Sequence, residues 1–406
     1  MSKRSASWSA VYNELLINEK EQIPLCAAET YLSDFVKQPL NSIFEGKYSC
    51  HDLSGNAFIE GKYIDKLNQL LKEMCKKLFN AKYSNADTIT GINCFTTTAM
   101  ALLSKNNNVL LTTPEQGGHP SIPKILDVLG VNYDSIPYNY STYQINYDEI
   151  NILCRHNKYD FLIFCQSDIL QAPDLNKLNI SKNTGIIYDA TQTLGLIAAK
   201  CNSNPLKINN TVLIGGTHKT LPAPACGLIM TNNLYYADKL YKNINPILLR
   251  NTQPNHIASL LLALIEQDIY GFEYQSNVIK TANELGYLLE HTGMTIAKIS
   301  ENQYTDTHQL FIKFSPKKTN EYFLNALKYN ISLNKKNKKL FGNTGIRIGV
   351  QQIARYNWRA NELKKLSELL FLLCNANENH EKILTLRNEL ITMKIPQFTC
   401  QDISIE

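Results

Sequence analysis

The sequence predicts an α/β protein in which a mostly parallel sheet is wrapped by helices, and three observations support this prediction. Apolar runs of strand length recur between turn residues, they alternate with segments of helix length, and 406 residues suffice for a large domain and a smaller one. The chain is 44% apolar and 19% charged, which excludes an intrinsically disordered protein and allows a large core.

Short apolar runs bounded by turn residues predict the strands of the main sheet, at 108–112, 161–165, 185–188, 212–214 and 227–230. Helical spacing of apolar residues predicts helices at 64–79, 93–103 and 256–269. Runs at 309–314 and 345–349 predict strands of a smaller C-terminal α/β domain. We therefore expect an N-terminal helical arm (1–24), a large domain (25–275) and a small domain (276–406).

Several classes of protein are not expected. The net charge of +5 is small and no basic-aromatic motif is present, so nucleic acid is not an expected partner. The longest apolar stretch, near 257–265, is too short for a bilayer, and the first residues lack the apolar segment of a secretory signal. Ten cysteines without a CxxC pair indicate reduced thiols in the cytoplasm, with neither disulfides nor a metal site. The lysine-rich stretch at 334–340 is expected to be a solvated loop, or alternatively a basic patch.

Polar residues follow three predicted strands, at the carboxyl ends where open α/β sheets bind ligands. Ser167 follows FLIFCQ, Asp189 follows GIIY and Lys219 follows VLIGGTH. A partly desolvated lysine is an amine nucleophile able to form a Schiff base, although a surface lysine starting a loop is the alternative. A carboxylate such as Asp189 can keep a ring nitrogen protonated, or it can simply cap a helix.

Three further segments are candidates for ligand contacts. Thr90 and Gly91 precede a predicted helix and could seat a phosphate, or serve only as its cap. His119 ends a Gly-Gly-His turn and can stack on an aromatic ring, or it can be an exposed turn residue. Arg347 lies in the apolar run GIRIG, where its natural partner is a substrate carboxylate and the alternative is an internal salt bridge.

Taken together, these segments resemble serine hydroxymethyltransferase and its relatives, which are pyridoxal-phosphate (PLP) enzymes of fold type I. The resemblance covers roughly residues 24–360 and rests on four motifs: THKTL at 217–221, DATQTLGL at 189–196 against the family pattern D-x-A-H-x-x-G-L, GGH at 117–119 and TGIRIG at 344–349. It implies a mostly parallel seven-stranded sheet in the large domain.

The resemblance also implies roles at matching positions. Lys219 corresponds to the lysine that carries PLP, Asp189 to the partner of the pyridine nitrogen and His119 to the imidazole stacked on the ring. The whole cofactor set that it implies is Thr90, Gly91, Ile92, His119, Ser167, Asp189, Gln192, His218 and Lys219.

On the substrate side, the resemblance makes Arg347 the clamp for an amino-acid carboxylate. The other substrate-binding positions that it implies are Ala28, Glu29 and Phe58. Tyr48 corresponds to a tyrosine that the neighbouring subunit lends to the site, which implies a homodimer or tetramer with shared active sites.

The departures from the family concern mainly its folate side. By register, the family's acid-base glutamate is Cys50, followed by His51, and its two tyrosines are Ala57 and Phe58. We take Cys50 and His51, with Tyr48, as candidate catalytic residues. Further replacements are Gln192 for a histidine, Ala28 for a serine next to the retained Glu29, and the segment 251–254 for a glycine-rich one.

The positions that bind the cofactor and the amino-acid carboxylate are retained, whereas the folate side is altered. This combination predicts a PLP-dependent enzyme that acts on a small α-amino acid of the glycine, serine or threonine type. The expected reaction is aldol-type cleavage or formation of the Cα–Cβ bond without folate. The alternatives are a genuine serine hydroxymethyltransferase, a racemase, decarboxylase or aminotransferase on the same scaffold, and a PLP-binding relative that has lost catalysis.

Overall fold

The computed structural model describes residues 3–49, 51–52, 55–56 and 58–401, and the chain divides into two compact units. The first unit combines Met1–Ala27, Asn277–Ala297 and Asn302–Gln397. The second unit holds Ala28–Ser276, Lys298–Glu301 and Phe398–Glu406.

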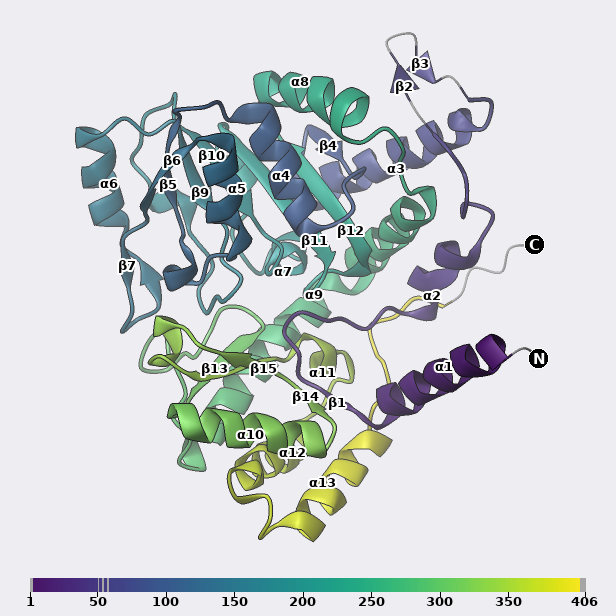
Figure 1. Ribbon diagram of the computed structural model, residues 1–406, viewed down its shortest axis with the longest axis vertical. Coiled ribbons are helices and arrows are strands. Elements are labelled where there is room, and N and C mark those ends of the chain that lie inside the picture. Colours follow the sequence, from purple (N-terminus) through teal and green to yellow (C-terminus); the bar gives the residue numbers. More distant parts are fainter. Residues whose placement is uncertain (1–2, 50, 53–54, 57, 402–406) are drawn as a thin grey trace. The chain divides into compact units, whose positions relative to one another are not determined.

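The second unit is built on a seven-stranded sheet (Figure 1). In spatial order its strands are β4 (Tyr83–Asn85), β12 (Pro222–Thr231), β11 (Thr211–His218), β10 (Gly185–Asp189), β9 (Phe161–Phe164), β5 (Asn108–Leu111) and β6 (Asn132–Ser135). The five strands from β11 to β6 are parallel, and β12 is antiparallel to both of its neighbours. The predicted α/β class with a mostly parallel seven-stranded sheet is therefore confirmed.

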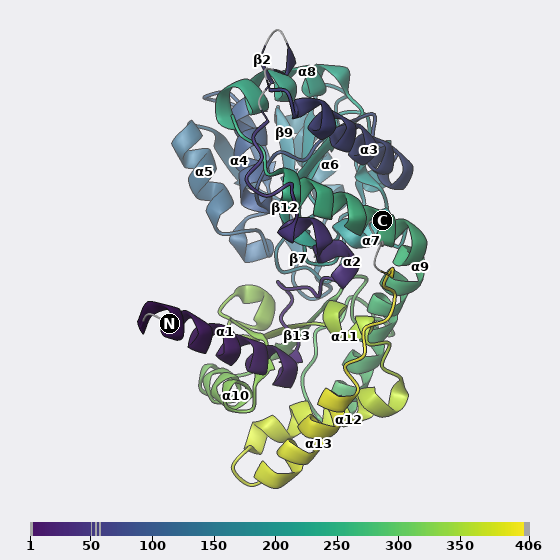
Figure 2. The ribbon, with the colours of Figure 1, turned by 90° about the vertical axis from the view of Figure 1, so that its right-hand side faces the viewer.

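Helices cover both faces of this sheet (Figure 2). On one face lie α4 (Gly91–Leu102), α5 (Ser121–Leu129) and α8 (Leu234–Asn243). On the other lie α3 (Gly61–Phe79), α6 (Tyr147–His156), α7 (Leu194–Ala198) and the first part of α9 (Pro254–His291). The short elements of this unit are α2 (Asp34–Lys37), β2 (His51–Asp52), β3 (Gly55–Asn56), β7 (Tyr138–Asn139), β8 (Gln144–Ile145), η1 (Gln38–Asn41), η2 (Pro114–Gln116), η3 (Leu175–Lys177), η4 (Pro205–Lys207) and η5 (Ile244–Leu248).

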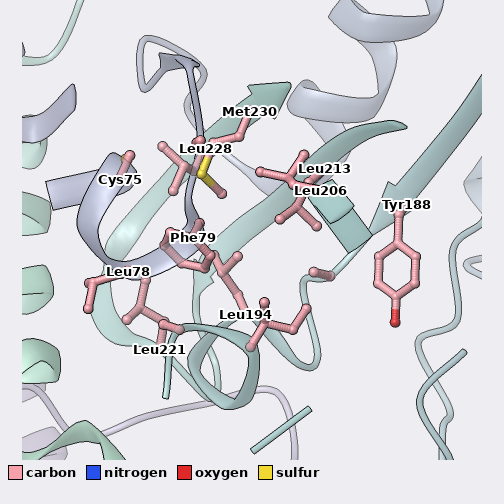
Figure 3. Packing of buried hydrophobic residues seen from close by; sticks show 14 of the residues in the cluster. Cys75, Leu78, Phe79, Tyr188, Leu194, Leu206, Leu213, Leu221, Leu228 and Met230 are labelled. Carbon is pink, nitrogen blue, oxygen red and sulfur yellow. The ribbon is translucent and has the colours of Figure 1, made fainter. Parts of the chain in front are cut away.

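The inner strands β5, β9 and β10 are mostly apolar because both faces of the sheet are buried there. Along β9, Leu162 packs into the core on one face and Ile163 into the core on the other, as the two-residue period of a strand requires. In the core on the α3 face, Phe79 packs with Leu213 and Met230 of the sheet (Figure 3). This packing fixes α3 on the sheet and so holds the strand ends in place.

The first unit has a three-stranded antiparallel sheet in the order β13 (Gln309–Lys313), β16 (Gly345–Gly349) and β15 (Asn334–Lys336). A parallel pair joins β1 (Ile23–Pro24) to β14 (Ile331–Ser332). The helical elements are α1 (Lys3–Glu21), the end of α9, α10 (Pro316–Lys328), α11 (Gln351–Arg355), α12 (Ala360–Leu372), α13 (His380–Thr392), η6 (Lys339–Phe341) and η7 (Leu373–Asn375).

For β15 and α9, the range predicted from the sequence was wrong. The stretch expected to be a solvated loop begins with β15, because the backbone of Asn334–Lys336 pairs with β16. The helix expected at 256–269 runs on to His291, because apolar side chains such as Tyr274, Val278 and Leu285 continue its buried face.

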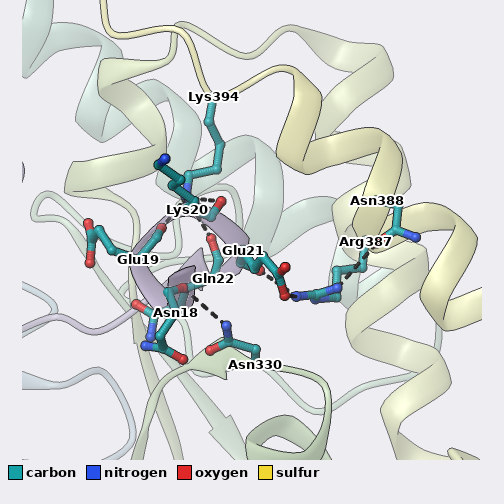
Figure 4. A network of polar contacts seen from close by, with 9 residues as sticks. All are labelled: Asn18, Glu19, Lys20, Glu21, Gln22, Asn330, Arg387, Asn388 and Lys394. Carbon is teal, nitrogen blue, oxygen red and sulfur yellow. Dashed lines mark hydrogen bonds and ion pairs between the residues drawn. The ribbon is translucent and has the colours of Figure 1, made fainter. Parts of the chain in front are cut away.

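The C-terminal end of α1 is held by two basic side chains (Figure 4). The ammonium group of Lys394 donates to the carbonyl oxygens of Glu19, Lys20 and Gln22 at 2.8, 3.1 and 2.9 Å. Arg387 donates to the carbonyl oxygen of Glu21 at 2.7 Å. These bonds satisfy carbonyls that the end of a helix leaves without intrahelical partners.

The large apolar side chains of α1, in contrast, lie in solvent. Their exposed fractions range from 41% to 67%, for Trp8, Val11, Tyr12, Leu15, Leu16 and Ile17. Within the described part of the chain, no helix has the length and apolar character needed to cross a membrane. The same residues contain no group of three or more metal-binding side chains.

Candidate active site

Polar residues gather at the carboxyl ends of the parallel strands of the second unit. Asp189 is the last residue of β10, and the half-buried Lys219 comes directly after β11. Because β9, β10 and β11 are parallel neighbours, their carboxyl ends meet at one edge of the sheet. Ser167, three residues after the end of β9, belongs to the same edge.

The charges at this edge are coupled. Burial raises the pKa of Asp189, while hydrogen bonds from Thr191 and the positive charge of Lys219 lower it. Burial and the charge of Lys219 both lower the pKa of His218, so its ring is neutral near pH 7. The Nδ1 atom of His218 is buried and has no hydrogen-bond partner in the described part of the chain.

Asp189 does not cap a helix. The next helix, α7, begins five residues later at Leu194, and its N-cap residue is Thr193. The alternative of a capping carboxylate is therefore ruled out for Asp189.

The N-terminus of α4 is brought close to β11. Thr90 is the N-cap residue, and its hydroxyl accepts the N–H of Asn93 at 3.2 Å. A Cβ atom on Gly91 would lie 2.8 Å from Oγ1 of Thr191 and 3.1 Å from the backbone nitrogen of Gly216, so only glycine permits this approach. The amide groups in the first turn of a helix attract anions, so this end of α4 can bind a phosphate. Ile92 is partly exposed there.

The loops after β5 and β9 are tied to one another. The carbonyl oxygen of Gly117 accepts the backbone N–H of Ser167 at 2.7 Å and its hydroxyl at 3.3 Å. The backbone N–H of His119 donates to the carbonyl oxygen of Cys165 at 3.0 Å, and its ring Nδ1 accepts the N–H of Ser121 at 3.3 Å. The structure thus brings Ser167 and His119 together and fixes the orientation of the imidazole.

Two residues complete this edge. Gln192 is buried, and its backbone carbonyl oxygen accepts a hydrogen bond from the hydroxyl of Thr220 at 3.0 Å. Thr191 was not among the predicted site residues, although it donates two hydrogen bonds to Asp189. The signal that could have found it was its departure from the family pattern, which has alanine at this position.

The segment around Tyr48 lies beside the β2–β3 hairpin, which contacts η5 and is seen near α8 in Figures 1 and 2. The rings of Tyr48 and Phe58 pack with centroids 4.8 Å apart, and both are more than 40% exposed. His51 begins β2. Cys50 lies outside the described residues.

A cavity of about 720 Å³ lies in the second unit, lined by residues of α3, β4 and α8. Ser49 and Thr252 both line it, and their buried hydroxyl oxygens have no hydrogen-bond partner among the described residues. On its wall, Asp87 accepts hydrogen bonds from the side-chain amides of Asn85 and Asn245 at 2.7 and 2.6 Å. The sequence did not predict this cavity.

Arg347 belongs to the first unit and lies buried in β16. Its guanidinium donates to Oδ1 of Asn334 on the neighbouring β15 at 2.9 Å. The amide of Asn334 in turn lies 3.5 Å from the sulfur of Cys26. Ala28 and Glu29 begin the second unit and are respectively half-buried and exposed.

Comparison with known proteins identifies the family. The family model described as serine hydroxymethyltransferase matches residues 5–370. Serine hydroxymethyltransferases of Thermoplasma volcanium and Archaeoglobus fulgidus are each 26% identical, covering 89% and 92% of this chain and 88% and 87% of their own length. A crystal structure of L-threonine transaldolase from Pseudomonas fluorescens in the internal aldimine state has a similar fold, with a TM-score of 0.89, 19% identity and coverage of 97% of this chain and 92% of its own. The chain therefore belongs to the serine hydroxymethyltransferase family.

Proposed function

We propose that this protein is a PLP-dependent enzyme that breaks or forms the Cα–Cβ bond of a small β-hydroxy α-amino acid without using folate. The observation that carries the proposal is that two half-buried residues, Lys219 and Asp189, lie at the carboxyl ends of neighbouring strands, where the charge of Lys219 lowers the pKa of Asp189 and α4 approaches β11. The relatives named above act on serine or threonine, as their names state.

The residues at this edge fit PLP. The amide groups at the N-terminus of α4 and the unpartnered Nδ1 of His218 suit the phosphate or the ring hydroxyl, and Gly91 lets this end of α4 lie close to Thr191 and Gly216. Asp189 suits the pyridine nitrogen, because a charged carboxylate stabilises a protonated ring. When bound through the amino group of Lys219, the cofactor supplies an electron sink for the bond that breaks at Cα.

His119 is proposed to stack on the cofactor rather than to act as the base. Its Nδ1 accepts the N–H of Ser121, so the neutral ring carries its hydrogen on Nε2 and has no free lone pair. The proton of the substrate's β-hydroxyl is then left for His51 or Cys50. Tyr48 precedes them on the same segment.

The substrate carboxylate is assigned to Arg347. Its planar guanidinium can donate two parallel hydrogen bonds, and the bond to Asn334 fixes its plane. Holding the carboxylate decides which bond at Cα is aligned for cleavage, so this residue contributes to the choice of reaction as well as to binding.

Folate independence rests on the replaced positions. Cys50, Ala57 and Phe58 stand where the family has a glutamate and two tyrosines, and none of them offers the same polar contact to a pteridine. We also propose a cytoplasmic location, since the ten cysteines include no CxxC pair and several lie in apolar runs, which is typical of buried reduced thiols.

The test is to incubate the purified, PLP-loaded protein with serine, threonine and related β-hydroxy amino acids, with and without tetrahydrofolate. We expect glycine and an aldehyde to form at a rate that tetrahydrofolate does not increase. One-carbon exchange with tetrahydrofolate at a comparable rate would instead identify a genuine hydroxymethyltransferase. Racemised, decarboxylated or transaminated products would identify a racemase, a decarboxylase or an aminotransferase, and no change of any amino acid would indicate a relative without catalysis.

We further propose a homo-oligomer with shared active sites. Ser49, next to Tyr48, and Thr252 line one cavity. Thr252 belongs to the segment 251–254, which stands where the resemblance implies a glycine-rich phosphate contact from the neighbouring subunit, so two segments that the family lends to its partner meet at this cavity. The exposed apolar side chains of α1, among them Trp8 and Leu15, offer additional surface for a second copy.

Mixing two inactive variants tests the shared site. Lys219→Ala and Tyr48→Ala are each expected to have little activity, but after subunit exchange a hybrid dimer contains one intact site. Random pairing predicts recovery of about a quarter of the wild-type activity. If each site were built from one chain, the mixture would stay as inactive as its components.

A further inference from the structure

Thr191 forms a hydrogen-bonded bridge between two strands at the proposed cofactor site. Its backbone N–H donates to Oδ1 of Asp189 at 2.9 Å, and its hydroxyl donates to the same oxygen at 2.5 Å. The hydroxyl oxygen accepts the backbone N–H of Gly216 in β11 at 2.9 Å. One side chain thus links the end of β10 to β11.

When Asp189 is ionised, the direction of these hydrogen bonds is fixed. An amide N–H can only donate, and an ionised carboxylate can only accept. The single hydroxyl hydrogen of Thr191 must therefore point to Asp189 while its oxygen faces Gly216. Bonds in such a chain polarise one another, which makes the hydroxyl a better donor than an isolated one.

This arrangement leaves one carboxylate oxygen available. Both hydrogen bonds reach Oδ1, and Oδ2 accepts none from the residues that the structure describes. The hydroxyl of Thr191 also packs against the first turn of α4. Gly91 has no Cβ atom, and one placed there would lie only 2.8 Å from the hydroxyl oxygen of Thr191. The hydrogen bonds from Thr191 oppose the rise that burial causes in the pKa of Asp189.

We infer that Thr191 is a positioning residue whose hydroxyl, held by the amide of Gly216, orients the ionised Asp189 so that Oδ2 meets the ring nitrogen of PLP. The inference rests on the proposed function. It concerns a position where the family pattern has alanine, so this chain adds a hydrogen bond that the pattern does not provide.

The test compares Thr191→Ala with Thr191→Ser. Alanine is the residue of the family pattern and is compatible with the fold, and serine lacks the methyl group but keeps the hydroxyl, so the difference between the two variants reports on the hydroxyl alone. Thr231→Val is the control, because the hydroxyl of Thr231 donates to the carbonyl oxygen of Thr211 at the opposite end of β11.

The measurement is the dissociation constant of PLP from the apoprotein as a function of pH, followed by the absorbance of the cofactor. Loss of a hydrogen bond to a charged group predicts that the dissociation constant of PLP is about tenfold higher in Thr191→Ala than in wild type. The constants of Thr191→Ser and Thr231→Val should lie within about twofold of wild type. Without the hydroxyl, Asp189 takes up a proton at higher pH, so the acid limb of the binding profile should shift to higher pH in Thr191→Ala only.

Each other outcome has a defined meaning. If wild type binds PLP and Thr191→Ala matches it in affinity and acid limb, the role of Thr191 is overturned while the proposed function stands. Equal losses in the alanine and serine variants would assign the effect to the methyl group and would also overturn it. A wild-type protein that binds no PLP overturns the inference together with the proposed function.

Discussion

Replacing Lys219 with alanine is expected to remove the visible absorbance of the bound cofactor and to stop the reaction. The amino group of Lys219 is the proposed covalent attachment point, and we propose that the same amine also transfers a proton in the reaction. Loss of a proton-transferring group alone lowers rates by about 10²- to 10⁴-fold, and loss of the attachment adds to this. Absorbance spectra and amino-acid cleavage assays measure the two effects separately.

A matched control is Lys242→Ala. Lys242 lies in the same unit and is exposed, with an ion pair to Asp238 at 2.7 Å, so its variant should keep both the absorbance and the activity. Reduction of the loaded wild-type protein with borohydride should attach the cofactor permanently to the peptide that contains residue 219. Attachment at another lysine, or an unchanged spectrum in Lys219→Ala, would contradict the assignment.

Replacing Arg347 with lysine should weaken the binding of amino acids far more than the binding of amines that lack a carboxylate. Lysine keeps the positive charge but loses the planar fork that grips both carboxylate oxygens. A lost hydrogen bond to a charged group predicts a KM about 10- to 100-fold higher for the amino-acid substrate. Because Arg347 contacts Asn334, circular dichroism and urea unfolding should accompany the kinetics.

The informative quantity is the ratio between two ligands. Binding of glycine and of methylamine to the PLP-loaded protein can be followed by the change in cofactor absorbance. In Arg347→Lys the preference for glycine should collapse, while methylamine binds as it does to wild type. A parallel loss for both ligands would show that Arg347 supports the fold rather than the carboxylate.

The central strands were predictable from sequence, and the edge strands were not. Residues 161–164 are buried on both faces of the sheet and therefore read as a continuous apolar run. The edge strands are polar, with Asn132–Ser135 exposed and Tyr83–Asn85 exposed or half-buried, so their pairing depends on the neighbouring strand rather than on their own composition.

Some residues of the candidate site were likewise predictable from the sequence, and others were not. Asp189 and Lys219 were found because each follows an apolar run, and the resemblance supplied their roles. Thr191 was missed because its bonds depend on the spacing of β10 and β11, which a single sequence does not display. The resemblance places Tyr48 in the site of a neighbouring subunit, a proposal that a single sequence does not test and that the mixing experiment addresses.

The capped end of α1 has a consequence for biosynthesis. The partners of the N-terminal segment, β14 for Ile23 and Lys394 for the helix end, are translated about 300 residues later or more. At ribosomal speeds this is a delay on the order of 15 to 60 s. During that time the end of α1 lacks both the strand that pairs with Ile23 and the ammonium group that binds its last carbonyl oxygens, so the N-terminal segment reaches its final position only after residue 394 has been made.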